Sequence, residues 1–158
     1  APPLAFPNRE ANALAEAELG WWAARIDEVL IAAGSEAAPP VLHQELFKLY
    51  GDPGRWRVYD DVADHLPRWQ DQGLRLAVVS NFDRRLEGLL EGLHLAPLID
   101  AVVVSSRCGA AKPSATPFHQ ALAALNVKAG EAWHVGDSPE DAAGARAAGL
   151  PCLLVRRP

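Results

Sequence analysis

Five polar residues in this 158-residue chain have side chains suited to phosphate and metal chemistry; they are Ser80, Asn81, Lys112, Asp137 and Asp141. A lysine ammonium binds a phosphate as a compact point charge, and the chain has only three lysines against twelve arginines. Two aspartates four residues apart at a turn can hold a hard divalent cation. Mg²⁺ commonly links one or two carboxylates to a substrate phosphate. These residue types therefore indicate phosphate chemistry assisted by Mg²⁺.

These polar residues follow segments with the pattern of buried strands. Short, nearly all-apolar runs predict strands at 74–79, 99–104, 132–135 and 152–155, and helical patterns separate them. Such alternation predicts an α/β fold with a doubly wound parallel sheet. In open α/β sheets, ligands bind beyond the carboxyl ends of the strands, so we expect the polar groups to face one crevice.

The chain divides into two parts by pattern. Residues 1–57 are predicted to contain only helices, with Asn8 as a helix N-cap and apolar residues such as Trp22 and Leu30 at helical spacing. Residues 58–158 contain all the predicted strands and are expected to form the α/β core.

The acidic turn also has a structural explanation. Ser138 as N-cap, Pro139 at the first helical position and Asp141 at the third resemble a capping box. This pattern explains Ser138 and Pro139, but it leaves Gly136 and Asp137 unexplained. For the same region, His134 is predicted to be a core or sheet-face histidine.

The order of these motifs resembles the haloacid dehalogenase (HAD) superfamily. Its second motif is a Ser or Thr at a strand end, here Ser80 in VVSN, and its third is a Lys, here Lys112 in AAKPSATPF. Its fourth is Gly-Asp followed by a second acid, here Asp137 and Asp141 in HVGDSPED. The run GDSPEDAAGARAAG is the most specific part. Phe82-Asp83-Arg84-Arg85 and Trp21-Trp22 further resemble the subgroup named HAD-like hydrolase domain-containing protein 3.

The resemblance implies a HAD-like Rossmannoid core over 58–158 and the remainder of a helical cap over 1–57. The family's first motif, Asp-x-Asp-x-Thr at the end of the central strand, is absent, because none of the ten aspartates stands two before another. In the family this strand lies between the first and third strands predicted here. We therefore expect a gap in the middle of the sheet, and a native protein that extends N-terminally by about 40–60 residues.

The activity implied by the resemblance is that of a Mg²⁺-dependent phosphatase acting on a small phosphorylated metabolite through an aspartyl-phosphate. Ser80 and the N–H of Asn81 would bind the transferring phosphate oxygens, and Lys112 would neutralise the nucleophile and the phosphate. Asp137 would bind Mg²⁺ directly, and Asp141 directly or through water. The chain as printed lacks the nucleophile and would be inactive alone.

Two other functions remain open. A metal-independent 2-haloacid dehalogenase has the same fold, but an acidic pair in a metal-free site would repel the nucleophile and the substrate carboxylate. A catalytically inactive HAD-like binding domain would follow if the first motif is lost in the natural protein.

Composition excludes several classes of protein. The net charge of −5 and the lack of a basic block exclude a nucleic-acid partner held by charge. No apolar run approaches the roughly 18 residues of a membrane span, so no membrane partner is expected. The two cysteines, Cys108 and Cys152, suggest no disulfide framework, and a cytoplasmic location is expected. The expected state is a monomer or a homodimer.

Overall fold

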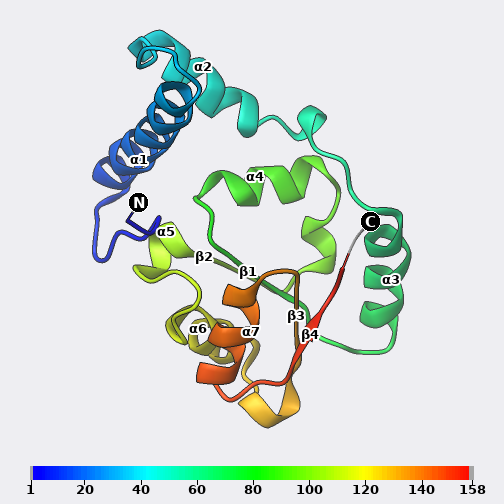
Figure 1. Cartoon of the computed structure of the whole chain (residues 1–158). Coiled ribbons are helices and arrows are strands. Elements are labelled where there is room, and N and C mark those ends of the chain that lie inside the picture. The colour runs from blue at the N-terminus through cyan, green and yellow to red at the C-terminus, as the bar shows by residue number, and fades with distance from the viewer. Residues whose placement is uncertain (1, 157–158) are drawn as a thin grey trace.

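The computed structural model describes residues 2–156, and its N-terminal part is helical. The elements in this part are α1 (Ala11–Ala32), α2 (Pro40–Tyr50), the short 3₁₀ helix η1 (Pro53–Arg55) and α3 (Asp60–Asp71). Helix α1 packs against α2, and the two form a layer apart from the strands (Figure 1). No helix within residues 2–156 is long and apolar enough to cross a membrane.

The rest of the chain alternates strands and helices, as the sequence predicts. In order, the elements are β1 (Ala77–Ser80), α4 (Arg85–Gly92), η2 (Ala96–Leu98), β2 (Ala101–Val104), α5 (Ser105–Cys108), α6 (Thr116–Leu125), η3 (Ala129–Glu131), β3 (His134–Gly136), α7 (Pro139–Ala147) and β4 (Cys152–Leu154). All four predicted strands are present, which confirms the α/β class with parallel strands. Each is shorter than its predicted range.

The four strands form two parallel pairs rather than one continuous sheet. β1 pairs with β2 in the register Ala77↔Ala101, and β3 pairs with β4 in the register His134↔Cys152. Over the described part of the chain, neither pair is hydrogen-bonded to the other. The gap expected from the sequence therefore lies between the two pairs, and the order β1-β2 and β3-β4 agrees with it.

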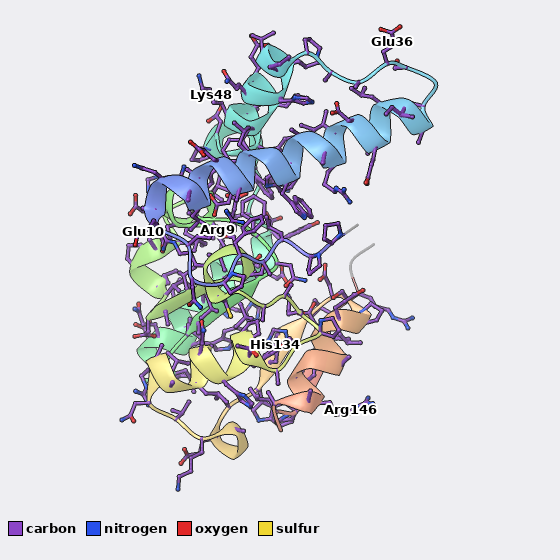
Figure 2. All side chains as sticks on the ribbon, turned by 90° about the vertical axis from the view of Figure 1, so that its left-hand side faces the viewer. Arg9, Glu10, Glu36, Lys48, His134 and Arg146 are labelled. Carbon is purple, nitrogen blue, oxygen red and sulfur yellow. The ribbon has the colours of Figure 1, made fainter. Side chains whose placement is uncertain are left out.

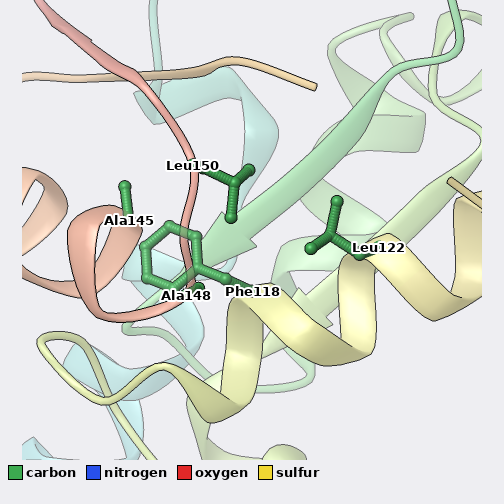
Figure 3. Packing of buried hydrophobic residues seen from close by; sticks show 5 residues of the cluster. All are labelled: Phe118, Leu122, Ala145, Ala148 and Leu150. Atoms are coloured by element: carbon green, nitrogen blue, oxygen red, sulfur yellow. The ribbon is translucent and has the colours of Figure 1, made fainter. Parts of the chain in front are cut away.

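A buried apolar cluster on helices α6 and α7 joins the two strand pairs. Its members, from these helices and the turn before β4, are Phe118, Leu122, Ala145, Ala148 and Leu150 (Figure 3). Val79 of β1 and Cys152 of β4 both pack against this cluster. Full burial of a side chain such as Phe118 contributes about 1.5–3 kcal/mol. This shared core connects β1 with β4, and so the two strand pairs, without direct strand pairing.

Two of the predicted boundaries that the structure corrects lie at the starts of α1 and β1. Helix α1 begins at Ala11 with Glu10 as its N-cap, and Asn8 instead adopts a left-handed conformation with φ 55°. Asparagine tolerates this conformation, so Pro7-Asn8 forms a turn before the helix rather than its cap. The first strand begins at Ala77 rather than at residue 74, and Leu74 is exposed.

Candidate active site

The predicted site residues lie at the carboxyl ends of the strands, where the sequence analysis placed them. Ser80 ends β1 and Asn81 follows it, while Gly136 ends β3 and Asp137 follows it. Lys112 lies between α5 and α6, after β2. Because ligands of open α/β folds bind at this edge, these residues mark the candidate active site.

Asn81 holds the backbone of Lys112 through both ends of its side-chain amide. Asn81 Nδ2 donates to the Lys112 carbonyl at 3.0 Å, and the Lys112 N–H donates to Asn81 Oδ1 at 2.7 Å. The Lys112 ammonium then donates to the Val79 carbonyl at 3.2 Å and to Asp141 Oδ1 at 2.6 Å. A continuous set of hydrogen bonds thus connects the ends of β1 and β3 through Lys112.

Asp141 is the centre of this hydrogen-bond network and is almost fully buried, with 2% of its surface exposed. Its Oδ1 accepts from Lys112 and from His134 Nε2, the latter at 2.8 Å. Its Oδ2 accepts from the Ser138 hydroxyl at 2.8 Å and from the backbone N–H groups of Ser138 and Asp137 at 3.2 and 3.3 Å. Since a carboxylate only accepts, His134 carries a proton on Nε2.

The hydrogen bonds keep Asp141 ionised despite its burial. Burial alone would raise the pKa of Asp141, but hydrogen bonds from Lys112, His134 and Ser138 outweigh it and lower that pKa well below the usual range. A buried carboxylate is tolerated in this way only when it is paired and fully hydrogen-bonded. The Lys112–Asp141 pair is therefore an ion pair at neutral pH.

The local sequence explains how Asp141 reaches this position. Ser138 caps α7, and its reciprocal bonds with Asp141 form the predicted capping box. A Cβ on Gly136 would lie 2.4 Å from Asp141 Cγ, so only glycine leaves room for the carboxyl group. The structure thus accounts for Gly136, which the sequence left unexplained.

Asp137 is the residue of this turn that packing does not explain. Its side chain is exposed and makes no hydrogen bond or ion pair with any of residues 2–156. Its backbone N–H donates a hydrogen bond to Asp141. The Ser80 hydroxyl, half-buried at the end of β1, likewise has no hydrogen-bond partner in the described chain. These two groups are free to bind a ligand.

His134 belongs to the site, although it was predicted only as a core or sheet-face residue. Its ring meets Phe118 edge-on with centroids 4.9 Å apart, while its Nε2 holds Asp141. Figure 2 shows His134 within the α/β part, away from Glu36 and Lys48 in the helical part. Its position on a strand face was predictable from the sequence, but its contact with Asp141 was not.

The donor set fits part of a Mg²⁺ site. Mg²⁺ takes oxygen ligands in octahedral geometry, and the free carboxylate of Asp137 suits it. The two oxygens of Asp141 already accept from five donor groups against about four lone-pair positions, so its predicted role as a metal ligand stays a prediction. Residues 2–156 contain no group of three or more His, Cys, Asp or Glu side chains that could hold a metal ion.

The fold and the order of the candidate site residues are those of haloacid dehalogenase-like proteins. The model of the haloacid dehalogenase-like hydrolase family matches residues 5–149. The chain belongs to this family, as its motifs indicated.

Named relatives support the assignment. The chain is 39% identical over 142 residues to haloacid dehalogenase-like hydrolase domain-containing protein 3 of Bos taurus, covering 87% of this chain and 56% of that protein. It is 41% identical over 99 residues to a phosphoglycolate phosphatase of Rhodospirillum rubrum, covering 62% of this chain and 41% of that protein. These matches confirm the predicted subgroup. The chain spans about half the length of the curated relatives that it matches.

A solved structure agrees on the fold. The crystal structure of a HAD phosphatase from Thermococcus onnurineus has a TM-score of 0.66 at 22% identity, covering 92% of this chain and 80% of that one. This likeness extends over the helical part as well as the α/β part.

Proposed function

We propose that this chain forms part of a Mg²⁺-dependent phosphatase that acts on a small phosphorylated metabolite through an aspartyl-phosphate intermediate. The observation that carries the proposal is the hydrogen-bonded connection Asn81–Lys112–Asp141, which gathers a lysine and an ionised carboxylate at the strand ends. The phosphoglycolate phosphatase relative supports a phosphate ester as the substrate class.

The free groups of the site suit a bound phosphate. The Ser80 hydroxyl and the adjacent Asn81 N–H can donate to phosphate oxygens. An ammonium has three donors, and Lys112 uses two of them on Val79 and Asp141, which leaves one for the phosphate. Such fixed charges and donors supply most of the catalysis in phosphoryl transfer.

Mg²⁺ would be held by Asp137 and would neutralise charge on the transferring phosphate. Asp141 would hold the side chains of Lys112 and His134 in place through its hydrogen bonds to them. The reaction also requires an Asp-x-Asp nucleophile motif, which this sequence does not contain. The proposal therefore concerns a protein that carries that motif together with this chain.

The test compares two acidic residues in one turn. In the full-length protein, we expect Asp137→Ala to lower kcat/KM for p-nitrophenyl phosphate by roughly 100-fold or more, because the metal supplies several kcal/mol of charge stabilisation. Glu140→Ala is the matched control, since Glu140 is exposed in the first turn of α7. If Asp137→Ala leaves metal-dependent hydrolysis intact, the assignment of Asp137 is wrong.

A further inference from the structure

Two fully buried carboxylates lie outside the site described above, where the N-terminal helices meet the α/β part. Asp83 and Glu18 each have 0% of their surface exposed. Asp83 lies two residues after Asn81 in the loop between β1 and α4, and Glu18 lies on α1. Figure 1 shows this loop on the side of the α/β part that faces α1. Burying a carboxylate is costly unless it is fully paired, so these residues fix a specific contact.

Asp83 connects the loop to both N-terminal helices. Trp22 Nε1 on α1 donates to Asp83 Oδ2 at 2.6 Å. Arg85 donates to the same carboxylate from Nη2 at 2.6 Å, from Nε at 2.8 Å and from its backbone N–H at 3.0 Å. Arg85 Nη1 donates in turn to the Phe47 carbonyl on α2, and its guanidinium lies 3.5 Å from the centroid of the Phe47 ring.

Glu18 makes a second connection from α1, to the same loop and to α5, which follows β2. Its Oε1 accepts from the Ser106 hydroxyl at 2.7 Å and from the Arg84 N–H at 3.3 Å, and Arg84 Nε lies 3.1 Å from its Oε2. The Ser106 N–H also donates to the Phe82 carbonyl at 3.3 Å. The loop that follows Asn81 is therefore held between α1 and α5.

We propose that Asp83 is a positioning residue that sets the pose of Ser80 and Asn81 by attaching their loop to α1 and α2. The carboxylate is fully hydrogen-bonded only when Trp22 and Arg85 are both in place. A shift of α1 would therefore withdraw the Trp22 donor from a buried charge, and a shift of α2 would remove the Phe47 carbonyl that helps to hold the Arg85 guanidinium against Asp83. In both cases the loop would move with the helix. The inference rests on the proposed function for its catalytic consequence, but the coupling itself does not depend on activity.

Hydrogen exchange on the full-length protein tests the coupling. Asp83→Asn should speed amide exchange in residues 80–86 by roughly 10- to 100-fold, because charge-assisted hydrogen bonds are lost there. Trp22→Phe removes one donor and keeps an aromatic ring, and it should give a smaller increase in the same segment. The control Glu87→Gln makes the same carboxylate-to-amide change on α4, where Glu87 pairs with Arg107 at the surface. It should leave amide exchange in residues 80–86 unchanged.

Kinetics separate positioning from general stability. If the protein hydrolyses p-nitrophenyl phosphate, Asp83→Asn should raise KM about tenfold and leave the Mg²⁺ concentration for half-maximal activity unchanged. A mere loss of folded enzyme would lower kcat without changing KM. Unchanged exchange at 80–86, or an equal increase over the core helix α6, would overturn the proposal. If the wild type has no phosphatase activity, the proposed function fails, and the exchange data still decide the coupling.

Discussion

Replacing Asp141 with asparagine tests whether this residue holds the site together. Asp141→Asn keeps the size of the side chain, but it removes the charge and places an NH₂ group among donors. The Lys112 side chain is only 14% exposed, and its ammonium would lose its carboxylate partner. His134 or Ser138 would then face a second donor. The substitution therefore breaks a buried ion pair on one side only.

The expected cost follows from this environment. Removing one partner of a buried ion pair costs about 3–5 kcal/mol, because the other charge stays buried without compensation. For a protein of this size, each kcal/mol lowers Tm by about 2–4 °C, so we expect a drop of about 6–20 °C. The double variant Lys112→Met/Asp141→Asn should lose less than the sum of the single variants, since no charge is then stranded.

Chemical and thermal unfolding of the full-length protein at several pH values measure this effect. The pKa of Asp141 is lowered in the folded state, so its contribution is present above the unfolded pKa near 3.9 and is lost as the pH falls. The wild type should therefore lose stability below about pH 5 more steeply than Asp141→Asn. A variant within about 0.5 kcal/mol of the wild type at pH 7 would refute this account of Asp141.

Three further predictions follow from single contacts. Asn81→Ala removes two hydrogen bonds to the Lys112 backbone and should destabilise the protein by about 2 kcal/mol in urea unfolding; no change would contradict its positioning role. Asp27 on α1 accepts hydrogen bonds from His43 and from the Ala38 N–H, and these bonds lower the pKa of Asp27. Asp27→Ala should therefore speed amide exchange in α2, and the wild type should lose the same protection against exchange in α2 as the pH falls below about 4. Burial raises the pKa of the Cys108 and Cys152 thiols, so iodoacetamide at pH 7 should alkylate both more slowly in the native protein than after unfolding.

Sequence reasoning located the strands because apolar runs in buried parallel strands are distinctive, but it extended the first one too far. In Leu74-Arg75-Leu76 the apolar residues alternate, yet Leu74 is exposed. The pairing starts where Asp100 can take part: its N–H donates to the Leu76 carbonyl at 2.8 Å, and its Oδ2 accepts from the Leu76 N–H at 2.7 Å. The Asp100 side chain, from a different segment, sets the start of the strand, so the local sequence pattern around Leu74 could not predict that boundary.

The position of the candidate site residues at the strand ends was predictable because their types and order are characteristic, whereas their hydrogen-bond partners were not. The sequence showed a capping box at Ser138 and Asp141, and the structure confirms it. It did not show that Asp141 also holds Lys112 and His134, because these contacts join residues 29 and 7 positions apart. The sequence indicated Asp83 only as part of a family motif, because its contact with Trp22 joins residues 61 positions apart.

The most direct test of the proposed phosphatase activity is the product that the full-length protein releases. We expect inorganic phosphate from p-nitrophenyl phosphate in the presence of Mg²⁺, and loss of that activity when a chelator removes the metal. The same preparation should release no chloride from 2-chloropropionate. Chloride release that a chelator does not affect, without phosphate release, would contradict the account and identify a haloacid dehalogenase.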